Sequence, residues 1–374
     1  TKYIGIVEIK HIHNQAHKNH AKKGSTVMAK RNFGDEFGFQ TRAVHTGNDV
    51  DSETGAIKRP ITMANSYELP YDPSDLNWSS AGKNLYTRNG GSNQQYLQEK
   101  LASLEGGEDC VVLASGVAAL SGLFFALLKS GDHVVFSSVT YIAVYRLLNE
   151  LLKDKFGVET TIVDTTDIEK VKAAIRPNTK LIHIETPGNP TLSISDIEKI
   201  AELAHASGAL LSVDNTFASP FNQRPIELGA DFTVESLTKY INGHGDAMGG
   251  AIIGKKEYLD IIRAQSQINL GATISPFNAW LIMRGSVTLP LRMKQHNENA
   301  LKVARYLKTV KGVSFVAYPG LEDHPNHDVA VKQMKNGFGG VLSFGLKADH
   351  DTYNRFVTHL KVITSAVSLG HDES

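Results

Sequence analysis

Short apolar or β-branched runs alternate with helix-like segments between residues 93 and 257, and this alternation limits the possible folds more than any other feature of the chain. The strand-like runs fall at 110–114, 133–138, 159–164, 180–185 and 209–213, and shorter apolar runs follow at 232–234 and 251–253. Helix-like segments separate them at 117–129, 143–153, 168–175 and 196–206. This rhythm predicts an α/β fold whose largely parallel sheet is covered by helices on both faces.

Further elements flank this alternation. Ser92 can cap a helix in which Leu97, Leu101 and Leu104 share one face, and the glycines at 106 and 107 would end it. Beyond about residue 285, a helix-like segment at 297–310 leads into apolar runs at 312–316 and 340–344. We therefore expect a smaller α+β domain after the sheet domain, in keeping with the two domains that 374 residues predict at ~150 residues each.

The composition excludes several classes of protein. Lys plus Arg and Asp plus Glu each number 39, so the chain has no net field to hold nucleic acid or an acidic membrane surface. Its single cysteine, Cys110, can form neither an intrachain disulfide nor a cysteine-rich metal site. No apolar run approaches the ~20 residues that span a bilayer. We expect a cytoplasmic protein with no nucleic-acid or membrane partner.

Residues 1–32 differ from the rest of the chain. They carry lysines and an arginine against one acid, Glu8, with histidines interspersed and no continuous apolar stretch of the kind found in signal peptides. We expect a disordered leader or an expression-derived segment, with Met28 as a natural start, and a histidine-rich metal site is the alternative. The rest of the sequence shows no metal-ligand spacing, so no metal is predicted.

Three polar groups follow strand-like runs, where parallel sheets collect ligands. Ser115, Gly116 and Val117 join a strand to a helix, and free N–H groups at a helix start favour a phosphate. Asp214 ends a buried-looking strand, where an ionised carboxylate is costly unless it meets a cation. Lys239 lies within SLTKY at 236–240, after the next run, and could form a Schiff base in a partly dry pocket.

Each group taken alone has an ordinary structural interpretation, as a tight turn, a turn-capping carboxylate and a solvated lysine. Their order along the chain points to one cofactor. Pyridoxal 5′-phosphate (PLP) needs a phosphate cup, an acid beside its pyridine nitrogen and a lysine that forms a Schiff base with its aldehyde. The sequence therefore predicts a PLP site built from 115–117, Asp214 and Lys239.

At these residues the chain resembles the PLP enzymes of cysteine and methionine metabolism, which include cystathionine γ-synthase, cystathionine γ-lyase, methionine γ-lyase and O-acetylhomoserine sulfhydrylase. The resemblance runs from about residue 41 to 374. Its motifs are TRAVHTG at 41–47, YTR at 86–88, SGVAA at 115–119, ETPGNP at 185–190, DNTF at 214–217, SLTKYINGH at 236–244, MRG at 283–285 and VSLG at 367–370. It implies the aspartate-aminotransferase-like fold, fold type I, with a mostly parallel seven-stranded sheet and a smaller α+β C-terminal domain.

The resemblance also divides the chain beyond the leader at 1–32. It implies an arm at 33–88 that contributes to a neighbouring subunit, a PLP-binding domain at 89–284 and a C-terminal domain at 285–374. The active unit would be a homodimer with shared active sites, usually assembled into a tetramer. Family members continue past the SLG turn to supply an arginine for the substrate carboxylate, so we expect the C-terminal domain to be incomplete here. If the chain truly ends at Ser374, a non-catalytic protein of the same fold is the alternative of another class.

Matching positions carry implied roles. Lys239 would hold PLP and act as the base, Asp214 would pair with the ring nitrogen, and Tyr141 would stack on the ring and act as an acid. Further cofactor contacts would come from Ser115, Gly116, Val117, Asn189, Thr216, Ser236 and Thr238, and from Tyr86 and Arg88 reaching across from a neighbouring subunit. Substrate contacts would come from Ser368, Val367, Leu85 and Tyr86.

The implied reaction is an elimination or replacement at Cγ of a small sulfur amino acid. The favoured interpretation is a methionine γ-lyase-like or cystathionine γ-lyase-like carbon–sulfur lyase. Leu85 and Val367 stand where cystathionine-handling lyases can carry carboxylates, so the first is preferred. Against it, Tyr141 is followed by Ile142 and Ala143, whereas methionine γ-lyases resemble Tyr-Gly-Cys. Cystathionine γ-synthase and O-acetylhomoserine sulfhydrylase are therefore the alternatives.

Overall fold

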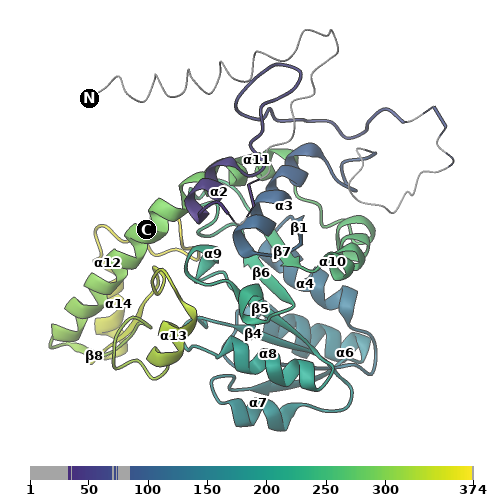
Figure 1. Ribbon diagram of the computed structural model, residues 1–374. Helices are drawn as coiled ribbons and strands as arrows, with labels where there is room; N and C mark the ends of the chain where they lie inside the picture. The colour runs from purple at the N-terminus through teal and green to yellow at the C-terminus, as the bar shows by residue number, and fades with distance from the viewer. Residues whose placement is uncertain (1–32, 35, 70, 73, 75–84, 373–374) are drawn as a thin grey trace, which may run out of the picture.

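The computed structural model describes residues 33–34, 36–69, 71–72, 74 and 85–372 (Figure 1). The expected leader at 1–32 lies outside the described residues. The described chain forms a sheet flanked by helices, and a smaller unit with its own two-stranded sheet follows it along the sequence.

The main sheet has seven strands in the order β1-β7-β6-β5-β4-β2-β3. They span Asp109–Leu113 (β1), His133–Ser137 (β2), Glu159–Val163 (β3), Thr179–Glu185 (β4), Leu210–Asp214 (β5), Phe232–Ser236 (β6) and Gly250–Gly254 (β7). β2 to β6 are parallel, whereas β7 runs antiparallel to both β1 and β6. The prediction of a mostly parallel sheet is confirmed, and each strand ends close to its predicted position.

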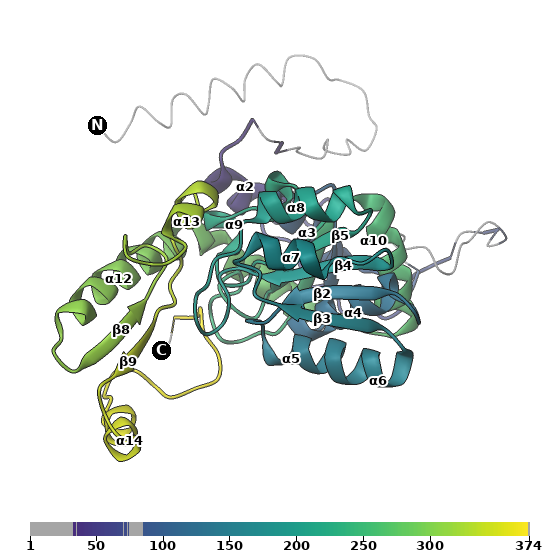
Figure 2. The ribbon, with the colours of Figure 1, turned by 90° about the horizontal axis from the view of Figure 1, so that it is seen from below.

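Helices cover both faces of this sheet, as predicted (Figure 2). α7 (Ile168–Ala174) and α8 (Ile197–Ala206) pack on one face, against side chains such as Val135 and Ile182. α4 (Gly116–Leu127), α5 (Ile142–Tyr145), α6 (Lys153–Phe156) and α10 (Lys256–Ile262) lie on the opposite face. Neighbouring β2 residues point to opposite faces: Val135 packs with α7 and α8, whereas Val134 and Phe136 pack with α4 and α10 on the other face.

The helix predicted at 143–153 is interrupted. A π-helical turn, Arg146–Leu152, joins α5 to α6, and a second one, Arg263–Asn269, continues α10. The 3.6-residue spacing of apolar side chains cannot reveal such a turn, because the buried Leu148 and Leu152 fit an ordinary helix equally well.

α3 (Ser92–Glu105) packs with α11 (Pro276–Gly285) and α2 (Phe39–His45) beside β1 and β7. The predicted cap at Ser92 is wrong: Ser92 is the first helical residue, and the extended Gly91 is the N-cap, whose carbonyl accepts from Gln95 N at 3.0 Å. The predicted end is confirmed, because Gly106 closes α3 in the left-handed conformation with φ 76°.

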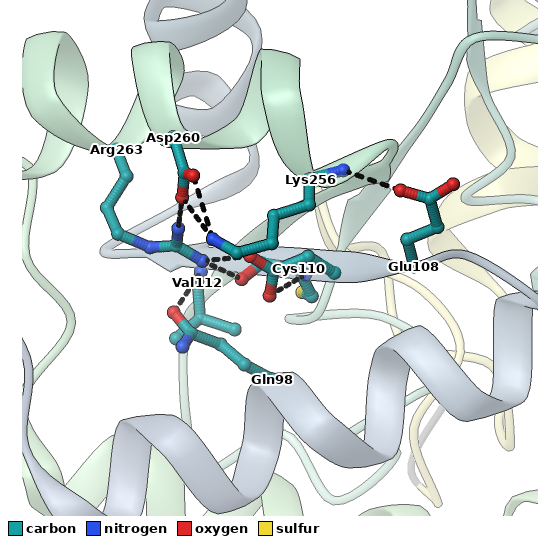
Figure 3. A network of polar contacts seen from close by, with 8 residues as sticks. Gln98, Glu108, Cys110, Val112, Lys256, Asp260 and Arg263 are labelled. Atoms are coloured by element: carbon teal, nitrogen blue, oxygen red, sulfur yellow. Dashed lines mark hydrogen bonds and ion pairs between the residues drawn. The ribbon is translucent and has the colours of Figure 1, made fainter. Parts of the chain in front are cut away.

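A buried arginine ties α10 to β1, and Gln98 of α3 joins the same strand by accepting from Val112 N at 3.3 Å (Figure 3). The Arg263 guanidinium donates to Asp109 Oδ2 at 2.8 Å, to the Cys110 carbonyl at 3.0 Å and to Asp260 Oδ1 at 2.9 Å. Cys110 is itself buried in β1, where burial raises the pKa of its thiol, so the lone cysteine is an inert strand residue. This network fixes the strand that leads into the turn at 115–117.

The smaller unit contains α12 (Leu289–Thr309), β8 (Val313–Ala317), α13 (His327–Gln333), β9 (Ser343–Leu346) and α14 (His350–Thr358). β8 and β9 pair antiparallel, so an α+β arrangement follows the main sheet as predicted. α12 begins at Leu289 rather than at 297, because Pro290 occupies the first turn, where a helix tolerates proline. Short helices α9 (Ser219–Asn222), Pro225–Leu228 and Ser286–Thr288 complete the fold.

Candidate active site

A cavity of about 280 Å³ opens at the carboxyl ends of β4, β5 and β6. Eleven of the predicted site residues line it: Ser115, Gly116, Val117, Tyr141, Asn189, Asp214, Thr216, Ser236, Thr238, Lys239 and Val367. The structure thus brings together residues that lie far apart in the sequence, such as Ser115 and Val367. Parallel sheets favour ligand sites at this edge.

The start of α4 forms one end of the cavity. The Ser115 side chain caps the helix by accepting from Ala118 N at 3.1 Å, so the first turn keeps its remaining N–H groups available. A Cβ at Gly116 would lie only 2.9 Å from both Cβ and Oγ of Ser236. Glycine therefore lets the helix start approach the end of β6 and leaves a small concave cradle that suits an anion such as a phosphate.

Asp214 stands at the end of β5, within the floor of the cavity. Its side chain is buried, and Oδ1 accepts from Thr216 N at 3.1 Å. Burial raises the pKa of Asp214, and the hydrogen bonds from Thr216 oppose that rise. A carboxyl group in this position is ready to pair with a cation inside the cavity.

Glu185 is a second acid on the cavity floor, which the sequence analysis missed. It ends β4 and is the register partner of Asp214 on β5. Burial and the neighbouring Asp214 raise the pKa of Glu185 to about 8. Its position in the sequence could have revealed it, because Glu185 ends a buried strand in the same way as Asp214. It also begins the ETPGNP motif, which contains the predicted site residue Asn189.

Lys239 enters the cavity from the segment between β6 and β7. Burial lowers the pKa of the Lys239 amine, and Nζ donates to Ser368 Oγ at 2.9 Å. Arg292 on α12 holds the following residues, because its guanidinium donates to the carbonyls of Tyr240 at 2.6 Å and Ile241 at 3.2 Å. The lysine backbone is thereby anchored while its amine faces the cavity.

The wall beyond Lys239 is mainly apolar. Val367 and Leu369 follow one another closely along the chain on either side of Ser368, and Met248 and Phe217 add further apolar surface. These four side chains offer no carboxylate to a distal ammonium group.

Four predicted site residues do not line this cavity. Ser368 meets it only through its hydrogen bond with Lys239, and the other three are Leu85, Tyr86 and Arg88. Leu85 is 7% exposed, which leaves little of its side chain for a substrate, whereas Tyr86 is 42% exposed. The Arg88 guanidinium carbon lies 5.1 Å from the centroid of the Tyr86 ring. Gln267 and Thr273 both donate to the Arg88 carbonyl, at 3.1 and 3.0 Å, so the backbone here is held firmly against the main domain.

A larger cavity of about 570 Å³ lies between α3 and α10, beside the Arg263 network. None of the predicted site residues lines it, so the smaller cavity is the site of interest. Within the described part of the chain, no group of three or more His, Cys, Asp or Glu side chains could hold a metal ion, and none of the described helices has the length and apolar character needed to cross a membrane.

The sequence model of the family described as "Cys/Met metabolism PLP-dependent enzyme" matches residues 40–374. The chain belongs to this family. It is therefore an enzyme whose cofactor is PLP, as predicted. The residues present fit that cofactor: the cradle at Gly116 suits its phosphate, the buried Asp214 suits a protonated ring nitrogen, and Lys239 reaches the same cavity.

Relatives in this family carry out related reactions. A canavanine γ-lyase of Rhizobium leguminosarum bv. trifolii (strain WSM2304) is 56% identical over 346 residues, covering 92% of this chain and 86% of the relative. An L-methionine γ-lyase of Fusobacterium nucleatum subsp. polymorphum is 40% identical, covering 91% and 86%.

A solved structure confirms the fold class. The crystal structure of cystathionine γ-lyase from Lactobacillus plantarum complexed with L-serine matches with a TM-score of 0.84 at 39% identity. The match covers 90% of this chain and 86% of that one. The family is of the transsulfuration type and acts on small amino acids, so the coarse functional prediction is confirmed.

Proposed function

We propose that this enzyme is a γ-lyase that cleaves the bond between Cγ of a small amino acid and a heteroatom, with canavanine as its first candidate substrate. The observation that carries the proposal is the single cavity in which Lys239, Asp214 and the start of α4 meet an apolar wall. The relative named canavanine γ-lyase, at 56% identity, supports this substrate over methionine, whose γ-lyase is 40% identical.

Each end of the cofactor has a counterpart among the cavity residues. The N-terminal turn of α4, with Ser236 and Thr238, would hold the phosphate, and Ser115 would support that turn as its cap. Tyr141 would lie against the ring and Asn189 beside its phenolic oxygen, while Thr216 supports the floor by accepting from Ser236 N at 2.9 Å. PLP, when bound, supplies an electron sink for the carbanion that forms at Cα.

Lys239 would move the proton at Cα. Because burial lowers the pKa of its amine, a larger fraction of Nζ is free to accept that proton at neutral pH. Ser368, which accepts from Nζ at 2.9 Å in this structure, would contact the substrate carboxylate. The Tyr141 hydroxyl would protonate the departing heteroatom.

The substrate preference follows from the apolar wall. Canavanine and methionine are both slim and carry a heteroatom on Cγ, whereas cystathionine would place a second ammonium group near Val367 and Leu369 without a carboxylate partner. The guanidinooxy group of canavanine is planar and, when protonated, delocalised and more weakly hydrated than an ammonium group, so it can lie against an aromatic ring such as Phe217 or Tyr141 without a carboxylate partner. This revises the preference for a methionine-like thioether that the sequence favoured.

A substrate panel tests the proposal. The kcat/KM values for canavanine, methionine, homocysteine and cystathionine are measured by release of the leaving group, so that γ-elimination and replacement by water are both detected. We expect canavanine to lead methionine by at least about tenfold and cystathionine by more. Lys239→Ala should abolish turnover of every substrate. Cystathionine as the best substrate would refute the apolar-wall argument.

We also propose that the active unit contains a second copy of the chain. Tyr86 and Arg88 do not line the cavity of their own chain. The Tyr86 side chain is exposed and the backbone at Arg88 is firmly held, so both residues are available to the site of a neighbouring subunit. Exposed apolar side chains around the cavity, including Val117, Ile142 and Met248, give that copy a surface to cover.

A further inference from the structure

Glu185 connects two segments that come from different strands. One carboxylate oxygen, Oε2, accepts from Tyr141 N at 2.5 Å and from Thr140 Oγ1 at 3.3 Å. The other, Oε1, accepts from Asn189 N at 3.0 Å. The side chain is 6% exposed, so all of these bonds are shielded from water.

We propose that Glu185 is a positioning residue that holds the Tyr141 segment and the Asn189 segment together and so fixes the orientation of the PLP ring. The inference rests on the proposed roles of Tyr141 and Asn189 at the ring. Glu185 acts through these two residues and through its strand neighbour Asp214.

The two segments meet independently of the carboxylate. A Cβ at Gly188 would lie 2.9 Å from Cγ1 of Val139 and 3.4 Å from its carbonyl oxygen, so only glycine allows this approach. Thr186 N also donates to the Asp214 carbonyl at 3.3 Å, which joins the same segment to β5. Glu185 therefore lies at the point where the supports of the ring face, the phenolic oxygen and the ring nitrogen converge.

The choice of a glutamate here is costly unless it serves the site. Two buried carboxyl groups on register-partner residues repel one another when both are ionised. A glutamine would avoid that repulsion, but it has one oxygen acceptor, whereas Tyr141 N and Asn189 N approach different oxygens of Glu185. A carboxylate can accept from both segments at once, and these two hydrogen bonds oppose the rise in the pKa of Glu185 that burial and Asp214 cause.

The test compares Glu185→Gln with a matched control on the same sheet. Ser212→Ala removes a buried hydroxyl that pairs with His183 at 2.8 Å, between the same strands β4 and β5 but away from the ring segments. The measurements are the PLP dissociation constant and the visible circular dichroism of the bound cofactor, with far-ultraviolet circular dichroism as a check of folding. These readouts do not depend on turnover.

We expect E185Q to weaken PLP binding by at least about tenfold and to reduce the visible dichroism, because one segment then faces an NH₂ group instead of an acceptor oxygen. S212A should leave both readouts within about twofold of wild type. A folded E185Q protein with wild-type affinity and dichroism would overturn the proposal. If E185Q does not fold, Glu185→Asp decides the matter, because its shorter side chain keeps both acceptors but cannot reach both segments.

Two further variants separate this inference from the proposed function. Tyr141→Ala and Asn189→Ala should each change the dichroism if those residues contact the ring. If neither variant changes affinity or dichroism, the proposed ring contacts fail. If both change them and E185Q does not, those contacts stand and the positioning role of Glu185 fails.

Discussion

Two acids lie buried behind the cofactor floor. Glu105 on α3 and Glu235 on β6 are both shielded from solvent and interact with one another, and Glu235 also accepts from Asn215 Nδ2 at 3.0 Å. Both oxygens of Glu105 lack a donor among the described groups. The pair is therefore satisfied only if one of the two carboxyl groups carries a proton that it donates to the other.

This pair predicts a loss of stability as pH rises. Burial raises the pKa of Glu105 from 4.5 to about 7 in the folded protein. The contribution of the protonated group to the free energy of unfolding is therefore fully present below about pH 4.5 and is lost as pH rises towards 7. Glu105→Gln removes this titration. We expect the free energy of unfolding of wild type to fall by up to about 3 kcal/mol relative to E105Q across that range.

Urea unfolding midpoints measured from pH 4.5 to 8 check this prediction. Glu202→Gln on α8 is the matched control, because Glu202 is exposed and its replacement should leave the pH profile of wild type unchanged. Parallel profiles for wild type and E105Q would show that the pair does not titrate in this range.

At the scale of single elements, the start of α4 depends on Gly116. Gly116→Ala would place a Cβ 2.9 Å from Ser236 Cβ, so helix and strand must move apart by a few tenths of an ångström. We expect PLP affinity to fall by at least about tenfold with a smaller change in melting temperature. Fluorescence titration with PLP measures this, with Gly312→Ala as control because no atom lies within 4 Å of a Cβ there. Unchanged PLP affinity in G116A would count against a phosphate at this turn.

Elements with a strong local pattern could be predicted from the sequence. β2 is buried at every position and contains the apolar run at 134–136, and Gly106 supplies the left-handed end of α3. The π-helical turns and the early start of α12 could not be predicted, because they depend on side chains that reach other elements. Arg292, for example, lies in the additional turns of α12 and donates to Tyr240 and Ile241.

The site shows the same division. Asp214 and Lys239 could be predicted because charged groups at the ends of apolar strands are unusual. Glu185 shares that position, but its importance comes from accepting N–H groups of Tyr141 and Asn189, and these contacts exist only once β2 and β4 lie side by side. Sequence order alone does not show that convergence.

At the scale of the whole molecule, shared active sites predict complementation between two inactive variants. Lys239→Ala lacks the amine, and Arg88→Ala lacks the group proposed to reach the neighbouring site. A hybrid dimer contains one site with both groups intact, so a mixture refolded in equal amounts should regain about a quarter of wild-type activity. The measurement is turnover of the mixture against each variant alone, with two samples of K239A mixed together as control. Activity no higher than the sum of the separate variants would contradict shared sites.

The position of β1 has a consequence for the order in which the protein can be made. β1 is an edge strand whose neighbour is β7, and β7 begins at Gly250, about 140 residues after β1 ends at Leu113. At roughly 5–20 residues per second, a ribosome needs on the order of 10 s to supply that partner. Until then β1 has no neighbouring strand to hold the turn at 115–117 in position. The nascent chain therefore cannot capture PLP before the segment carrying Lys239 has emerged.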